Sequence, residues 1–133
     1  MIFDETNEFS AKQAITVSAA STNVIDLGVD RDIGKGAPVE LVIMVTTLFA
    51  GGTSIDAALE TDDNSGFSSA TSIWTSGAIA TATLVKGYRF AIRFMPRANE
   101  RYLRIYYTVV GTMSAGNIQA GLVLGDQSNA ANV

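Results

Sequence analysis

The stretch Val29–Pro38 contains Gly34-Lys35-Gly36, the run in this chain that comes nearest to a phosphate-binding loop. A loop of that kind needs Gly-Lys followed by Ser or Thr, and it leads into a helix whose N-terminus faces the phosphates. Here Gly36 follows Lys35, and Pro38 leads into an apolar run typical of a strand. We therefore expect an exposed corner between two strands rather than a nucleotide site.

Carboxylates offer two further kinds of chemistry. The run Asp62–Gly66 begins like a calcium loop, but its glycine comes too early, and position twelve counted from Asp62 is Ile73 instead of Glu. We expect a hairpin loop whose Asp and Asn side chains bind local backbone. Asp56 and Glu60 lie four residues apart on one predicted strand, about 13 Å, which exceeds the usual separation of glycosidase carboxylates.

The 133 residues include neither histidine nor cysteine. Triads built on histidine, thiol catalysis and thiolate metal sites are therefore excluded. We expect no catalytic residue, no cofactor-binding residue and no metal ligand, and hence a protein that is not an enzyme.

Arginine and tyrosine are concentrated in one part of the chain. Five of the six arginines fall between positions 89 and 104, and alternation predicts an outward face that carries Arg89, Arg93, Tyr102, Arg104 and Tyr106. Acidic side chains on neighbouring strands could neutralise these arginines, with Glu40, Asp56 and Glu60 as candidates. An acidic partner protein could do so equally well, since Arg and Tyr are favoured interface anchors. Single-stranded nucleic acid would also fit, but the net charge of −4 argues against it.

Phe3, Phe9 and Phe49 lie in segments expected to connect strands, and so does Phe67, which follows the loop Asp62–Gly66. Each could pack beneath its own sandwich or dock on a neighbouring molecule. Together with the Arg and Tyr residues, Phe3, Phe9 and Phe49 complete the predicted protein interface.

Alternation with period two runs through most of the chain, whereas no segment sustains a helical period. The clearest case is a hairpin in which Tyr88–Met95 and Tyr102–Val109 pair across the polar connector Pro96–Glu100. Further strands are predicted at these ranges: Ile15–Val17, Asn23–Leu27, Val39–Thr46, Ile55–Thr61, Thr71–Thr75, Ala80–Val85 and Ile118–Leu124.

About eight to nine short strands with little or no helix predict an all-β, antiparallel sandwich, for which we favour a jelly roll over an immunoglobulin-like fold. The length suits a single domain over residues 1–133, with an N-terminal arm at 1–12 and a flexible tail at 126–133. The acidic N-terminus lacks the pattern of a secretory signal, and no apolar run is long enough to span a membrane. We expect synthesis in a host cytoplasm and no membrane partner.

Four segments, in this order and spacing, carry a resemblance to a known family. They are FSAKQAITVSAASTNVIDLG (Phe9–Gly28), DIGKGAP (Asp32–Pro38), LETDDNSGFSSATS (Leu59–Ser72) and GYRFAIRFMPRANERYLRIYYTV (Gly87–Val109). The chain resembles the capsid cement, or head-decoration, proteins of short-tailed bacteriophages of the Bordetella-phage type. The resemblance extends from Met1 to about Leu124.

The resemblance implies a non-enzymatic jelly-roll subunit of the virion that binds the outer surface of the icosahedral shell. Its expected partners are the phage major capsid protein, whose subunits it would bridge against internal DNA pressure, and other copies of itself. A dimer is favoured over a trimer. The alternative from a different class is a carbohydrate- or receptor-binding sandwich module.

Overall fold

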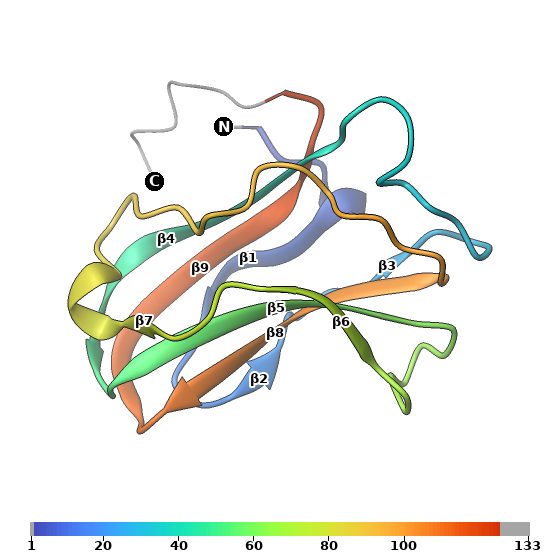
Figure 1. Ribbon diagram of the computed structural model, residues 1–133. Coiled ribbons are helices and arrows are strands. Elements are labelled where there is room, and N and C mark those ends of the chain that lie inside the picture. The colour runs from blue at the N-terminus through green and yellow to red at the C-terminus, as the bar shows by residue number, and fades with distance from the viewer. Residues whose placement is uncertain (1, 126–133) are drawn as a thin grey trace.

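The computed structural model describes residues 2–125, which form two antiparallel β-sheets packed face to face (Figure 1). In these residues the helical structure amounts to two three-residue 3-10 helices. The elements, in chain order, are η1 Glu5–Asn7, β1 Glu8–Ala14, β2 Ala19–Ala20, β3 Ile25–Asp26, β4 Glu40–Gly51, β5 Ser54–Asp62, β6 Thr71–Thr75, β7 Ile79–Ala80, η2 Thr81–Thr83, β8 Tyr102–Val110 and β9 Met113–Val123.

Sheet A has the strand order β1-β9-β4, and sheet B has the order β2-β8-β5-β6, with β3 beside β8 and β7 beside β5. Two tight turns, β4 to β5 and β8 to β9, carry the chain from one sheet to the other. The turns contact each other, since the Gly52 amide donates to the Thr112 carbonyl at 2.8 Å and the Thr53 amide to the Val110 carbonyl at 2.7 Å. This contact joins the two sheets at one end of the sandwich.

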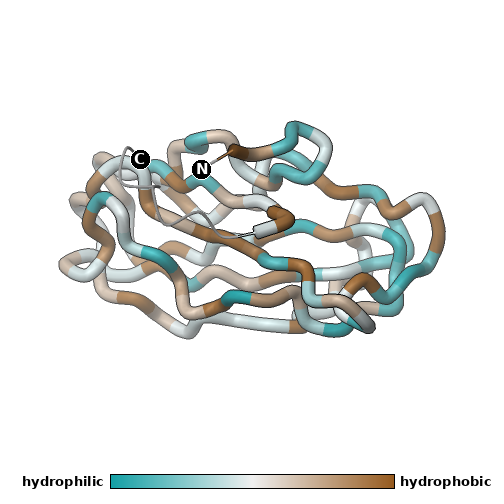
Figure 2. Tube along the Cα trace, turned by 90° about the horizontal axis from the view of Figure 1, so that it is seen from above, coloured by the Kyte–Doolittle hydropathy of each residue, from teal (hydrophilic) through white to brown (hydrophobic). Residues whose placement is uncertain are grey.

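Alternating side chains fill the space between the sheets. Along β8, Leu103, Ile105 and Tyr107 are fully buried, whereas the residues between them face outward. Figure 2 shows hydrophobic and hydrophilic stretches interspersed along the trace. Hydrophobic burial at about 25 cal/mol per Å² is the main term that holds such a core together. The predicted all-β antiparallel sandwich with little helix is confirmed, while the jelly-roll connectivity stays a prediction.

Most predicted strands lie near their observed positions, and Thr71–Thr75 agrees with β6 at both ends. The predicted strand Ala80–Val85 is wrong, because β7 ends at Ala80 and Thr81–Thr83 form η2. The position predicted for the first strand is also wrong. Alternation favoured Ile15–Val17, but β1 spans Glu8–Ala14 and pairs with β9. The predicted arm at 1–12 is therefore too long, because only the residues up to Asn7 precede the first strand. The predicted tail at 126–133 lies outside the described residues.

The predicted hairpin is also wrong. β8 pairs with β5, β2 and β3 in sheet B. The segment 87–95 instead runs along β4 in sheet A as irregular backbone. Its hydrogen bonds include those that the Leu41 amide donates to the Arg93 carbonyl at 2.8 Å and the Phe90 amide donates to the Ile43 carbonyl at 3.0 Å. The connector 96–101 therefore crosses between the sheets instead of turning within one.

The N-terminal arm lies over the outer face of sheet A. Phe3 packs against a small cluster of Val42, Met44 and Val123, which is separate from the main core. The ring sits directly above Gly121, where a Cβ atom would come within 2.7 Å of the Phe3 Cδ1. Asp4 fixes the start of η1, since its carboxylate accepts from the Thr6 amide at 3.0 Å. The glycine thus leaves the space in which the arm docks.

Candidate functional site

The loop Val29–Pro38 is the predicted corner, connecting β3 to β4. Asp32 holds it against the 96–101 connector by accepting from the Arg97 Nε at 2.9 Å and the Ala98 amide at 3.1 Å. Gly34 packs so closely that a Cβ atom would lie 2.2 Å from the Pro96 carbonyl oxygen. Lys35 is exposed in a turn and faces no helix N-terminus of the described chain. The loop thus leads into the strand β4 and lacks the helix that a phosphate-binding loop of this type requires.

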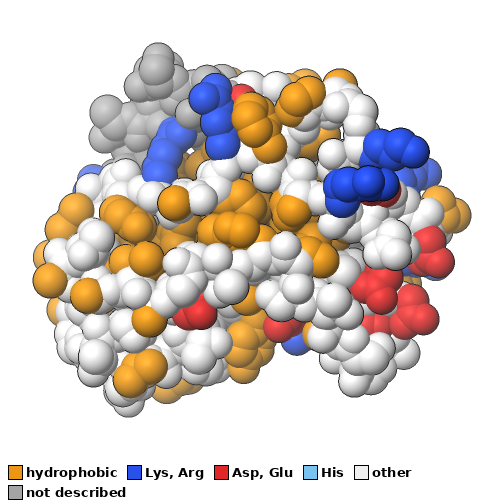
Figure 3. Space-filling view, viewed as in Figure 1, with side chains coloured by type: hydrophobic (Ala, Val, Ile, Leu, Met, Phe, Trp, Pro, Cys, Tyr) orange, Lys and Arg blue, Asp and Glu red, His pale blue; other side chains and the backbone are white. Residues whose placement is uncertain are grey.

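Charged side chains gather at this end of the molecule, as Figure 3 shows. Arg101 donates two hydrogen bonds to Asp26, at 2.7 and 2.8 Å. These bonds, together with a hydrogen bond from the Gly28 amide, lower the pKa of Asp26 to about 2. The Arg97 contact likewise lowers the pKa of Asp32. These pairs tie the loops of this end to one another, which explains their charge without a ligand.

Asp62 organises the loop between β5 and β6, as expected for a hairpin loop. Its buried carboxylate accepts from the Asn64 amide at 2.9 Å and the Ser69 amide at 2.8 Å. Burial raises the pKa of Asp62, but these hydrogen bonds outweigh burial and the net shift is downward. Interaction with Asp62 raises the pKa of Asp63. Residues 2–125 contain no group of three or more acidic side chains placed to share a metal ion.

The predicted interface does not form one surface. Arg89 and Arg93 lie on the segment beside β4 in sheet A, whereas Tyr102, Arg104 and Tyr106 project from β8 in sheet B. The two groups are separated because the predicted hairpin does not exist. Two smaller surfaces replace the predicted patch, and each has its own chemistry.

Phe9 and Phe49 are not available to a partner. Their exposed fractions are 0% and 3%, and both belong to the main hydrophobic core. Phe9 lies in β1 and Phe49 in β4, so alternation within a strand places both rings between the sheets. Their assignment to an interface is therefore wrong, and Phe3 is the member of this group that remains partly exposed.

The first surface, here called the Tyr–Arg face, consists of the outward side chains of β5 and β8. Antiparallel register pairs Glu60 with Arg104 and Ala58 with Tyr106. The Arg104 Nε donates to the Glu60 Oε2 at 2.7 Å, which confirms one of the internal ion pairs considered from the sequence. Tyr102, Ala58 and Tyr106 are all partly exposed, whereas the side chains of Arg104 and Glu60 are 19% and 17% exposed, so the described chain covers this face only in part.

Phe67, one of the apolar loop residues named from the sequence as able to dock on a neighbour, extends the Tyr–Arg face. Its ring centre lies 4.2 Å from the Arg104 guanidinium carbon, and the Tyr106 ring lies 5.4 Å from the same carbon. Phe67 has φ 52°, a left-handed conformation that is uncommon for a residue other than glycine. Backbone conformation of this kind has no reliable signal in a single sequence. The stack holds the guanidinium in place between aromatic rings.

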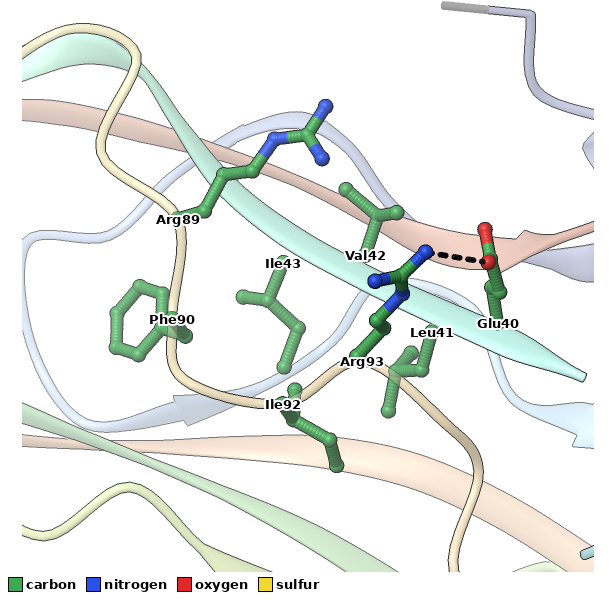
Figure 4. Close-up of a pocket in the computed structure, with 8 residues that line it drawn as sticks. All are labelled: Glu40, Leu41, Val42, Ile43, Arg89, Phe90, Ile92 and Arg93. Atoms are coloured by element: carbon green, nitrogen blue, oxygen red, sulfur yellow. Dashed lines mark ion pairs between the residues drawn. The ribbon is translucent and has the colours of Figure 1, made fainter. Parts of the chain in front are cut away.

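The second surface, here called the Arg93 corner, consists of Glu40, Arg89, Arg93 and Phe94. In Figure 4 both arginines project from the same segment across β4, with Val42 between them. Arg93 lies 3.6 Å from Glu40, which confirms the second internal ion pair, and its side chain is 70% exposed. The Glu40 Oε2 is buried and accepts no hydrogen bond from the residues that the structure describes.

The hollow beneath these arginines has a volume of about 30 Å³ and opens to the surface. A water molecule needs about 10–15 Å³ measured in this way, so the hollow suits solvent and is too small for an organic ligand. Beside it, the Phe94 ring is 46% exposed and lies 5.2 Å from the Arg93 guanidinium carbon. The Arg93 corner therefore presents an exposed cation and an exposed ring to whatever approaches it.

The chain matches the model of a known protein family. No curated protein matches the sequence. No helix in the described part of the chain is long and apolar enough to cross a membrane. The Bbp16 family model matches residues 9–122, which is most of the chain and includes both sheets. The protein therefore belongs to the Bbp16 family, a phage-related family.

Proposed function

We propose that the protein is a non-enzymatic structural component of a bacteriophage virion, a cement protein that binds the outer surface of the major capsid shell and stabilises it. The observation that carries the proposal is the match of residues 9–122 to a phage-related family. The all-β sandwich fits the role, because a cement subunit needs a stiff scaffold with surfaces for repeated contacts. Multi-site attachment allows each of these contacts to be weak.

The Arg93 corner is the surface that we assign to the shell. It combines an exposed arginine with an exposed aromatic ring, the residue types that most often anchor protein interfaces. Glu40 supports the assignment, since it lies 3.6 Å from the Arg93 guanidinium and holds this exposed cation at the corner.

The alternative function, a carbohydrate- or receptor-binding module, finds one supporting observation. Tyr102 and Tyr106 are partly exposed on an open sheet face, where a sugar ring could stack. Trp74, the single tryptophan, is likewise partly exposed, and it packs against the core. Binding to a glycan array without affinity for shells would favour this alternative over the cement role.

The shell assignment is tested by co-sedimentation of the purified protein with shells assembled from the phage major capsid protein. The wild type should pellet with the shells. Arg93→Glu and Phe94→Ala should each weaken binding at least about tenfold, in the range expected for an interface anchor. Arg31→Glu makes the same charge change at an exposed position in the 29–38 loop and should bind as the wild type does. Equal binding by all four proteins would contradict the assignment.

A further inference from the structure

Association by strand addition is blocked at the described sheet edges. β2 and β3 have two residues each, and β1 contains register shifts together with Lys12 at φ 49°. β6 is interrupted by a register shift opposite Leu59 and Glu60. The segment 87–95 pairs irregularly with β4 and carries two arginines. Short, bulged and charged edges are the devices by which proteins avoid edge-to-edge pairing, so these edges favour a partner that binds through side chains.

The open Tyr–Arg face carries charges in a self-complementary pattern. In the register of β5 and β8, Arg104 and Asp56 lie on opposite sides of the Tyr106–Ala58 pair, two positions away in each direction. A two-fold axis that crosses the face at Tyr106 and Ala58 therefore places the Arg104 of one copy opposite the Asp56 of the other, twice. Two-fold interfaces of this isologous kind are the commonest in soluble oligomers.

Arg104 and Asp56 each retain binding capacity in the single chain. Arg104 uses its Nε for Glu60, and no described residue accepts from its two terminal nitrogens. Asp56 accepts from the Thr75 hydroxyl at 2.6 Å and the Ser76 hydroxyl at 3.2 Å, but it has no cationic partner in residues 2–125. Glu60, in contrast, is already engaged by Arg104. The terminal nitrogens of Arg104 and the carboxylate of Asp56, which lack a charged partner among the described residues, thus both lie on the Tyr–Arg face.

The centre of the face is suited to contact with another sheet. Tyr106 is bordered by the small side chain of Ala58 on one side and by Ala20 on the other, according to the strand register. Small neighbours leave space beside the ring for side chains from an opposing sheet, which would stack at about 10 Å. Phe67 and Tyr106 keep Arg104 in one orientation, so little side-chain entropy is lost on binding.

We propose that the Tyr–Arg face binds a second copy of this chain, in a two-fold dimer centred on Tyr106 and Ala58 with reciprocal Arg104–Asp56 ion pairs between the copies. The proposal rests on the self-association that belongs to the proposed cement role. It assigns the second copy to sheet B and leaves the Arg93 corner of sheet A to the shell.

The decisive experiment mixes two charge-reversal variants in sedimentation-velocity runs. Alone, Asp56→Lys places Lys opposite Arg104, and Arg104→Glu places Glu opposite Asp56, so each variant should dimerise at least about tenfold more weakly than the wild type. Mixed together, the two variants restore both ion pairs and should form a heterodimer. Arg93→Glu, an equal charge change on sheet A, should dimerise as the wild type does.

Circular dichroism and thermal melts establish that each variant is folded, and Ala58→Arg provides a second probe that leaves both charged residues in place. It puts a long cation at the proposed two-fold axis and should prevent dimerisation. A monomeric wild type, single variants that dimerise normally, or a mixture that stays monomeric would each overturn the proposal. Shell binding by the same proteins is measured separately, so failure of the dimer and failure of the cement role give different results.

Discussion

The Arg104 guanidinium carbon lies 4.2 Å from the centre of the Phe67 ring, although Phe67 must adopt a left-handed backbone conformation to reach it. Such a conformation costs about 1 kcal/mol for a residue with a side chain. The loop tolerates this cost because Asp62 binds the amides of Asn64 and Ser69 on both sides of the ring. The strained residue thus lies beside the Tyr–Arg face of sheet B, where it covers part of Arg104.

Removing the Phe67 ring should reveal how much the stack contributes. Phe67→Ala keeps the strained backbone but loses a ring that is 8% exposed, so we expect destabilisation of about 2–4 kcal/mol in denaturant unfolding. Phe67→Leu restores apolar volume without the aromatic face, and it should recover much of the stability. If both variants were as stable as the wild type, the ring would have no structural role.

Gly121 should control the docking of the N-terminal arm. Gly121→Ala introduces a Cβ that would lie 2.7 Å from the Phe3 ring and 2.9 Å from the Asn7 carbonyl oxygen. We expect the arm to be displaced, with faster proteolytic cleavage within residues 2–7 and a nearly unchanged core. Gly125→Ala is the matched control, because nothing lies within 4 Å of its added Cβ. Equal cleavage of the two variants would contradict the packing of Phe3.

The buried hydroxyl of Tyr107 should make a measurable contribution to the free energy of unfolding. It lies 2.9 Å from the Ser10 Oγ inside the core, and burial raises the pKa of the phenol well above its usual range. Tyr107→Phe removes this hydrogen bond while Ser10 keeps its contact with Gln13. We expect a loss of about 1 kcal/mol in the free energy of unfolding, with no ionisation of Tyr107 in the wild type up to pH 11 by ultraviolet absorbance.

The Asp26–Arg101 pair should make stability depend on pH in acid. The pKa of an aspartate is about 3.9 in an unfolded chain, whereas that of Asp26 is lowered to about 2. Its contribution is therefore fully present above about pH 4 and is lost as the pH falls towards 2. Asp26→Asn and Arg101→Gln should each flatten this part of the stability profile, measured by urea unfolding from pH 6 to pH 2. A wild-type slope in both variants would exclude the pair as its source.

Alternation in the sequence reported correctly which residues face the core in β8 and which in β5. It could not identify the neighbouring strand, because period two specifies a face of a sheet and carries no information about pairing. The run 88–95 shows the consequence. Its alternation and its short connector to β8 favoured a hairpin, yet its hydrogen bonds go to β4. The alternation that places Arg93 outward would place Phe94 inside, yet Phe94 is exposed and Met95 is buried, since irregular backbone shifts the pattern by one residue.

Only part of each candidate surface could be predicted, because alternation gives the face of a strand but not its neighbour. Tyr102, Arg104 and Tyr106 share a face because they belong to one strand, and both internal ion pairs involve acids named from the sequence. Arg89 and Arg93 were placed beside them only through the incorrect hairpin. Phe67 and Asp56 acquire their roles from a loop conformation and from cross-strand register, which depend on the folded chain as a whole.

The cement role is tested most directly by heating phage heads that contain the protein and heads that lack it, and recording the temperature at which DNA is released. The account predicts that heads lacking the protein release DNA at a lower temperature, and that adding back the purified wild type restores the higher value. Release at the same temperature from both kinds of head would contradict the proposed stabilisation of the shell.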